Sequence, residues 1–395
     1  MGLPQQRGGF LFKVMTVNLE VFNRFFGPFV AVDQPKTQSI LQKNAPYTLE
    51  KYHDELAKTN VFSVELLKEL DEKIKAFNKT LDEISVVCVQ EDILVLKDGT
   101  LTPLLTSIAD IPLVSSCKSH VFGWKLTVDM YGAGGHLGNS IYSRVDGKNI
   151  LCPDLSYKVN DIPRCYTMFE AIIGEHKIKI ANVHLSGGRD DDKAALLNDK
   201  TLDVKSKQAN QVIRSMPTII CGDFNTQPPV PWIKMRYGYF VTLLNYMFAD
   251  PTYGHAAREG LESFINDKEP SNFKFADPTP DHSYYDQIMK HPKNNIIIDF
   301  YLQRYEKWMH GLYKVFTDNG YVYTNSAGKI KDTSAFGGCV DGIFALPVVR
   351  CVDVYRIDNS MVSNPKFGDA TAGFQPPFTP YYTDHFPVVA EFTDA

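Results

Sequence analysis

Short apolar runs alternate with amphipathic stretches and long polar loops along this chain, a pattern typical of an α/β protein. Runs of strand length predict strands over residues 10–17, 84–89, 139–143, 166–173, 177–185, 218–221, 340–346 and 386–392. Two consecutive runs flank Gly174-Glu175-His176 and predict a hairpin. Apolar residues at three- and four-residue steps predict helices over 54–81, 196–213 and 298–315.

Polar side chains meet these predicted strands at one end. Four predicted strands end at such residues: Asn18 and Glu20, Gln90 and Glu91, Asn182 and His184, and Asp223 and Asn225. Two others start from them, one at Asp341 and one at Asp384 and His385. One polar residue after a strand is usually a turn former, but six such cases form a pattern. The end of one strand and the start of its antiparallel neighbour share a sheet edge. We therefore expect these groups to converge on one rim.

Four carboxylates in that set, those of Glu91, Asp223, Asp341 and Asp384, would repel one another strongly. Two carboxylates about 5 Å apart cost about 3 kcal/mol at an effective dielectric constant of about 20. Such a cluster needs a divalent cation, a bound proton or a pairing cation. Oxygen ligands without a Cys/His set favour Mg²⁺ or Mn²⁺ over Zn²⁺.

Composition narrows the class of protein. The chain has 395 residues, of which 44% are hydrophobic and 22% charged, as in soluble globular proteins. Its net charge of −5 means that any binding to nucleic acid must rest on a local patch or a small contact area. Seven cysteines, several inside apolar runs, no signal-peptide pattern and no run of about 18 apolar residues predict reduced thiols and no membrane span. We expect an intracellular protein, cytoplasmic or nuclear, that is not secreted.

One domain is predicted over residues 10–395, with an insertion at 256–335. The insertion is polar and rich in Pro and Asp in its first half, and its core would be thin for an independent domain. Loops at a sheet rim often select the substrate, so the insertion could shape a substrate pocket or a partner surface. Its aromatic residues, among them Tyr284, Tyr313 and Phe316, could stack bases. The spacing of Tyr301, Tyr305 and Trp308 is more typical of the apolar face of a packed helix.

Seven short motifs, in this order, resemble the endonuclease/exonuclease/phosphatase superfamily, the DNase-I-like fold. They are Thr16-Val17-Asn18-Leu19-Glu20, Val89-Gln90-Glu91, Gly138-Asn139-Ser140-Ile141-Tyr142-Ser143-Arg144, Asn182-Val183-His184-Leu185, Gly222-Asp223-Phe224-Asn225, Val340-Asp341-Gly342-Ile343-Phe344 and Thr383-Asp384-His385-Phe386-Pro387-Val388. The resemblance implies an α/β fold, a four-layer α/β/β/α sandwich of two mixed sheets flanked by helices. It also implies an enzyme, a metal-dependent phosphoric ester hydrolase.

The same resemblance implies roles for single residues. Glu91 would be the principal ligand of Mg²⁺ (or Mn²⁺), with Asn18 beside the metal and Asp384 reaching it. Glu20 matches an acidic position that only some members keep, and a solvated loop residue is an equal alternative. Arg189, in a Gly-Gly-Arg loop, and Arg164, before a strand, are candidates for substrate binding. Three aspartates follow Arg189, so local ion pairs in a solvated loop explain it as well.

For catalysis, the resemblance implies that Asp223 orients or deprotonates the attacking water and that Asn225 fixes both the phosphate and Asp223. His385 would contact the phosphate, with Asp341 paired to its imidazole. His184 would bind the phosphate or assist the leaving oxygen, although it could also be a satisfied polar residue in a strand.

The motifs predict a metal-dependent phosphodiesterase that attacks its phosphoester in line, with a nuclease or nucleic-acid end-processing enzyme favoured. Thr226-Gln227 after Asn225 departs from the inositol polyphosphate 5-phosphatase and tyrosyl-DNA phosphodiesterase patterns. His184 stands where apurinic endonucleases carry Tyr. Deadenylase-like and sphingomyelinase-like members stay open, so a phosphodiesterase or phosphatase acting on lipid headgroups or small molecules is the alternative. A catalytically silent binding scaffold is a third reading. The sequence names no protein partner.

Overall fold

The structure is a computed structural model. It describes residues 10–18, 47–58, 78–97, 100–103, 105–120, 136–157, 164–186, 199–226, 272–277, 284–295, 311–330, 339–357 and 385–394, with residue 333 and scattered positions at 64–75 and 258–279.

Within this described part, the first sheet has nine strands in the order β14-β15-β1-β3-β7-β6-β5-β2, with β4 paired to β3. It is mixed, because β1 lies parallel to β3 and antiparallel to β15. The strands are β1 (Leu11–Asn18), β2 (Tyr47–Thr48), β3 (Val86–Lys97), β4 (Thr100–Pro103), β5 (Leu105–Ile108), β6 (Ile111–His120), β7 (His136–Ser143), β14 (Val349–Arg356) and β15 (Val388–Asp394).

The second sheet has six strands among the described residues, in the order β12-β13-β11-β10-β9-β8. It is also mixed, since β10 is parallel to β11 while β11 is antiparallel to β13. The strands are β8 (Gly147–Ile150), β9 (Tyr166–Ile173), β10 (His176–His184), β11 (Ile219–Asp223), β12 (Val322–Tyr323) and β13 (Asp341–Ala345), and the named helices are α2 (Leu49–Lys58), α5 (Asp199–Arg214) and α8 (Tyr284–Lys290).

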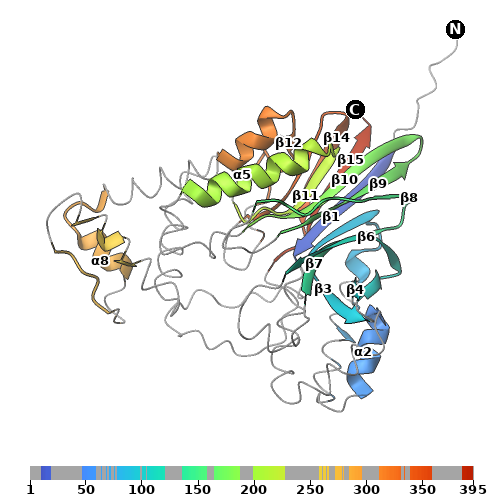
Figure 1. The fold of residues 1–395 in the computed structure, drawn as a ribbon, viewed down its shortest axis with the longest axis horizontal. Coiled ribbons are helices and arrows are strands. Elements are labelled where there is room, and N and C mark those ends of the chain that lie inside the picture. Colours follow the sequence, from blue (N-terminus) through green and yellow to red (C-terminus); the bar gives the residue numbers. More distant parts are fainter. Residues whose placement is uncertain are drawn as a thin grey trace, which may run out of the picture.

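The two sheets face each other across a common apolar core (Figure 1). Alternate residues of each strand enter it, such as Phe12 and Val14 of β1 and Ile178 and Ile180 of β10. This two-sheet core agrees with the sandwich that the motifs predict.

A second apolar cluster lies on the other face of the second sheet. Ala209 and Val212 of α5 pack there with Tyr313, Phe316 and Phe344. Figure 1 shows α5 lying along this sheet. The helix over 311–318 and strand β12 therefore pack into this second cluster, and both fall within the predicted insertion. Tyr313 and Phe316 are buried in this cluster, and Tyr284 of α8 is buried elsewhere, against Phe275 and Arg258. These three rings are therefore not available to stack bases. This helical layer is the third layer of the predicted sandwich, and the fourth stays a prediction.

The predicted strands all appear, most with boundaries within two residues, while β3 continues to Lys97 and β7 begins at His136. The hairpin turns at Gly174-Glu175 between β9 and β10, as predicted. The helix predicted over 54–81 begins earlier, as α2 at Leu49, directly after the strand Tyr47–Thr48 that pairs with β5. Helix α2 ends at Lys58.

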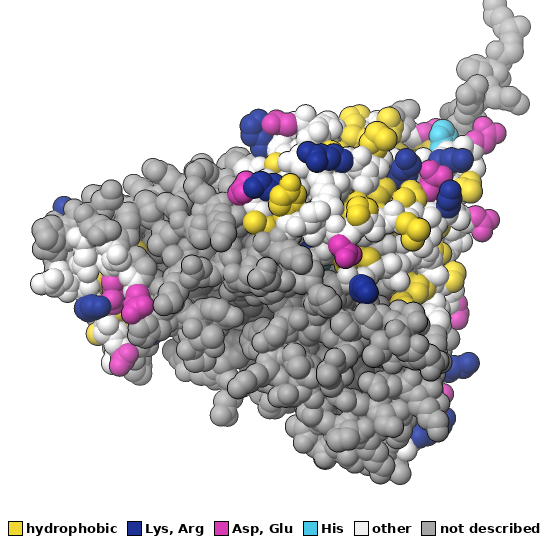
Figure 2. All heavy atoms as spheres, viewed as in Figure 1, with side chains coloured by type: hydrophobic (Ala, Val, Ile, Leu, Met, Phe, Trp, Pro, Cys, Tyr) yellow, Lys and Arg dark blue, Asp and Glu magenta, His cyan; other side chains and the backbone are white. Residues whose placement is uncertain are grey.

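The seven cysteines are unpaired, and Cys88, Cys165, Cys221 and Cys339 are buried, as expected for reduced core thiols. In the part of the chain that the structure describes, no helix is long and apolar enough to cross a membrane. On the described part of the face in Figure 2, Lys and Arg side chains are interspersed with Asp and Glu.

Candidate active site

The inner faces of the strands change from apolar to polar towards one end of the sandwich. In β1 the inward series runs Phe12, Val14, Thr16, Asn18, and in β10 it runs Ile178, Ile180, Asn182, His184. Because side chains alternate between the two faces of a strand, the polar ends of these series lie between the sheets. The candidate site is this polar end of the inter-sheet core.

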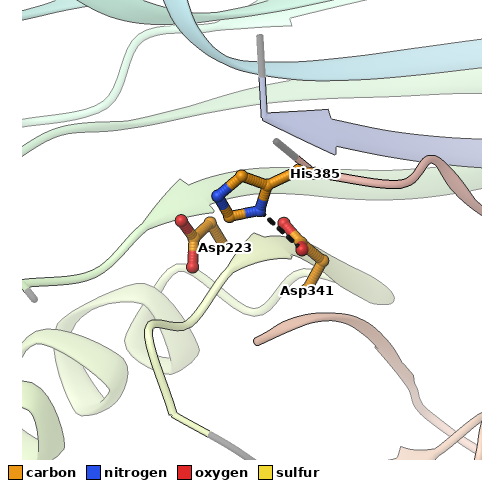
Figure 3. A group of neighbouring side chains, drawn as sticks. All are labelled: Asp223, Asp341 and His385. Carbon is orange, nitrogen blue, oxygen red and sulfur yellow. Dashed lines mark hydrogen bonds and ion pairs between the residues drawn. The ribbon is translucent and has the colours of Figure 1, made fainter. Parts of the chain in front are cut away.

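Strand register sets three of its side chains in one row. His184 of β10 is opposite Asp223 of β11, and Asp223 is opposite Asp341 of β13. Residues paired across neighbouring strands project from the same face. His385, three residues before β15 of the other sheet, reaches the same point, as Figure 3 shows.

Asp223 is held by a donor at each of its oxygens. The backbone N–H of Asn225 donates to Oδ1 at 2.7 Å, and the side-chain amide of Asn18, from the other sheet, donates to Oδ2 at 3.0 Å. Asn225 adopts a left-handed backbone (φ 49°), which Asn tolerates better than most residues. The carboxylate is 2% exposed, so its orientation is fixed by these contacts and not by solvent.

Asp341 and His385 form a hydrogen-bonded pair. His385 Nδ1 lies 2.8 Å from Asp341 Oδ2, and the other ring nitrogen faces Asp223 (Figure 3). Burial raises the pKa of the Asp341 carboxyl to about 6, although the neighbouring His385 opposes this shift. Thr333 supports the pair: its hydroxyl oxygen accepts the N–H groups of Val340 and Asp341, and its carbonyl accepts that of Phe386.

His184 is buried against Arg164. The guanidinium Nη1 lies 3.2 Å from His184 Nδ1 and 3.1 Å from Nε2. Nη1 is thus almost equally distant from the two ring nitrogens. In the plane of the ring, an atom at such a position would collide with the ring carbons, so Nη1 lies over the face of the ring. Burial, and then the charge of Arg164, lower the pKa of His184 well below its usual value. His184 is therefore a neutral imidazole that can donate one N–H.

Glu91 reaches this site because β3 has a bulge. The pairing of β3 with β7 shifts between Val89 and Asp92, and Glu91 has a left-handed backbone (φ 55°). A bulge turns a side chain away from the face that strict alternation would give it, and such strain is common at functional sites. Glu91 Oε1 consequently lies 3.8 Å from Nε2 of His184, which itself lies 3.5 Å from Oδ2 of Asp223.

The donor chemistry at this point fits a hard divalent cation. Glu91 offers a carboxylate and Asn18 a carboxamide, and oxygen donors of this kind suit Mg²⁺ or Mn²⁺. Asp223, Asp341 and His385 also place ligand-type atoms within 4.8 Å of one another. His385 Nδ1 is already bonded to Asp341, however, so we interpret that trio as a base beside an Asp–His pair and not as the metal site.

Local cations offset the predicted repulsion among the acids. Arg164, and Lys205 in its protonated form, contribute positive charge beside Asp223 and His184, and both side chains are buried. Asp341 is paired with His385, and Asp223 has its two N–H donors. Pairing therefore offsets much of the repulsion among these acids, and a bound divalent cation would neutralise more of their charge.

The structure thus brings together Asn18, Glu91, Arg164, His184, Asp223, Asn225, Asp341 and His385 of the predicted site. Glu20, Arg189 and Asp384 lie outside the described residues.

Sequence reasoning missed two contributors, Thr333 and Lys205. Nothing in the sequence distinguishes Thr333 from other loop threonines. Lys205 had a signal, because it shares a helix face with Ala209 and Val212, where an apolar residue is expected.

The chain resembles solved endonuclease/exonuclease/phosphatase structures at low similarity. It has 12% identity to a family protein from Leptotrichia buccalis C-1013-b, covering 96% of this chain and 99% of that one with a TM-score of 0.42. An AP endonuclease from Archaeoglobus fulgidus gives 13% identity, coverage of 96% and 98%, and a TM-score of 0.40. The human nocturnin catalytic domain with bound sulfate gives 10%, full coverage of both chains and 0.38.

No protein-family profile matches the sequence, and no curated protein matches it. At these identities and TM-scores the likenesses carry no functional argument.

Proposed function

We propose that this protein is a divalent-metal-dependent phosphodiesterase that hydrolyses a phosphoester by in-line attack of water. One observation carries the proposal. Asp223, a carboxylate with a hydrogen bond at each oxygen, lies at the polar end of the core beside the Asp341–His385 pair. Neutral His184 and Glu91, which the β3 bulge directs inward, lie at the same place. This set combines a proton acceptor, an anion-binding ring and a cation ligand, the groups that phosphoryl transfer requires.

In this proposal Asp223 accepts a proton from the attacking water, and its two N–H donors keep the accepting oxygen aimed at that water. His385, held by Asp341, contacts the phosphoryl oxygens through its second ring nitrogen. His184 donates its N–H to the phosphate or to the leaving oxygen, because its neutral state leaves one donor. Arg164, behind His184, adds positive charge to the same region.

Glu91 and Asn18 would hold the cation, with Asp384 and Glu20 as further proposed ligands. A bound Mg²⁺ or Mn²⁺ supplies neutralisation of the charge on the phosphoryl oxygens.

For the substrate, we favour a phosphodiester of nucleic-acid origin, as the sequence motifs suggest. The net charge of −5 favours a small contact area, such as a strand end or a single nucleotide linkage, over extended binding along a duplex. A lipid-headgroup or small-molecule phosphodiester is the alternative that the same charge supports.

A substrate panel tests the proposal. Single-stranded DNA, RNA, abasic duplex, 5′-tyrosyl DNA, poly(A) and sphingomyelin are incubated with the protein in Mg²⁺, in Mn²⁺ and after EDTA. We expect hydrolysis of at least one substrate, loss in EDTA, and recovery when metal is restored. Parallel reactions with Asp223→Asn protein exclude a contaminating hydrolase. Activity that survives chelation would remove the metal role of Glu91, and inactivity on the whole panel would favour the silent scaffold.

A further inference from the structure

Lys205 of α5 is a fully buried lysine that is anchored to the loop after β11. Its Nζ donates to the carbonyl oxygen of Asn225 at 2.6 Å and to the hydroxyl oxygen of Thr226 at 2.7 Å. Its side chain is 0% exposed. A buried amine is costly unless it is hydrogen-bonded, so these two contacts account for why a lysine is tolerated on the packed face of α5.

These contacts lie one step from the proposed base. Asn225, whose carbonyl Lys205 holds, gives its own N–H to Asp223 Oδ1 and its side-chain amide to the carbonyl of Leu185. The peptide N–H can point at Asp223 only while Asn225 keeps its left-handed backbone (φ 49°). That conformation is costly for a residue other than glycine, and the bonds from Lys205 hold the turn in place.

The same face of α5 also fixes the loop after β10. Three residues along the helix from Lys205, Gln208 accepts the N–H of Ser186 and donates to the Ser186 hydroxyl. Residues three apart lie on one side of a helix. Helix α5 therefore holds the two loops that follow the strands of His184 and Asp223.

We propose that Lys205 is a positioning residue: through Asn225 and Thr226 it holds the loop at 223–226 in the conformation that orients Asp223 for catalysis. This inference rests on the proposed function where it concerns turnover, and on the hydrogen bonds alone where it concerns the loop. Positioning requires two N–H donors, which a lysine amine carries whether or not it is protonated.

The test compares Lys205→Met with Lys207→Met, a matched change on the same helix at an exposed lysine paired with Asp203. We expect Lys205→Met to lower kcat about tenfold to a hundredfold, because small displacements of a catalytic group have effects of this size. KM should change by less than about threefold, since substrate contacts are intact. Lys207→Met should behave as wild type.

Thr226→Val, alone and with Lys205→Met, tests whether Lys205 acts through the loop. If it does, adding Thr226→Val to Lys205→Met lowers kcat no further, because coupled residues are not additive. Multiplied losses in the double variant would overturn the proposal.

Hydrogen exchange of the amides at 223–226 provides a readout without substrate. We expect at least about fivefold faster exchange in Lys205→Met and no change in Lys207→Met. Wild-type exchange and kcat in a folded Lys205→Met protein would overturn the proposal.

If the wild-type protein hydrolyses no substrate, the proposed function is contradicted, and the exchange rates still decide whether Lys205 holds the loop. If Lys205→Met does not fold, Thr226→Val decides: faster exchange supports the proposal and wild-type exchange overturns it.

Discussion

Asp223 has one N–H donor at each oxygen, and a carboxylate can accept at both of its terminal atoms whereas a carboxamide accepts at one. In Asp223→Asn, one of the two donors would face an NH₂ group, and the amide would be a far weaker base than the carboxylate. We expect turnover to fall at least about 10²-fold with the fold retained, measured by steady-state kinetics and circular dichroism. Asp203→Asn, the same change at an exposed position of α5, is the control. An unchanged rate in Asp223→Asn would remove this residue from the mechanism.

Lys205 also makes stability depend on pH. Burial lowers its pKa to about 7, whereas an unfolded lysine keeps a value of 10.5. Between these values the unfolded chain binds more protons, so the free energy of unfolding rises with pH. From pH 7 to pH 9, wild type should gain about 2 kcal/mol relative to Lys205→Met, in urea titrations at both pH values. An equal difference at the two pH values would contradict the lowered pKa.

At the scale of elements, Gly222 lets β10 and β11 approach closely. A Cβ at this position would lie 1.9 Å from the carbonyl oxygen of Val183, and Gly222 has a φ of 149°. Gly222→Ala must therefore separate the strands that carry His184 and Asp223.

We expect the free energy of unfolding of Gly222→Ala to fall by about 3 kcal/mol, with kcat falling as well. Gly174→Ala is the matched control, because it also has positive φ but open space around its Cβ. That variant should lose only about 1 kcal/mol. Equal losses in the two urea titrations would show that the contact with Val183 does not matter.

Strand positions and the polar strand ends could be predicted from the sequence because both follow from local alternation. Asn18, His184 and Asp223 continue the inward series of their strands, so an apolar pattern that turns polar already marks the end of the core. The bulge at Glu91 could not be predicted, because the register between β3 and β7 depends on a partner some 50 residues away. Neither could Arg164 over His184, which is a contact between side chains.

At the scale of the whole molecule, the site exists only because two sheets meet. Asn18 and Glu91 come from the first sheet, and His385 lies three residues before β15 of that sheet. His184, Asp223 and Asp341 come from the second sheet. The sequence predicted that such groups converge, and it predicted an insertion at 256–335. The last part of that segment includes β12, which pairs with β13 of the second sheet. Phe316 and Tyr323 are buried against Phe344, and this packing attaches the end of the segment to the second sheet. The local polarity of the sequence does not indicate such packing.

Asn182 joins the two sheets directly beneath the site. Its side-chain amide donates to the carbonyls of Val89 at 2.8 Å and Ser140 at 2.9 Å, and its oxygen accepts Gln90 Nε2 at 2.6 Å. Val89 and Ser140 are the last pair before the β3 bulge, where the ladder is interrupted. Asn182 therefore satisfies backbone groups at the bulge that directs Glu91 into the site.

Replacing Asn182 by Ala would deprive two buried carbonyls and the Gln90 amide of this partner, so we expect a loss of about 2–4 kcal/mol in the free energy of unfolding. Because Glu91 depends on the same bulge, the concentration of Mg²⁺ needed for half-maximal activity should rise as well. Asn319→Ala, at an exposed amide that caps only its own helix, should change stability by less than about 0.5 kcal/mol. Wild-type stability and metal dependence in Asn182→Ala would mean that the bulge holds its shape without the second sheet.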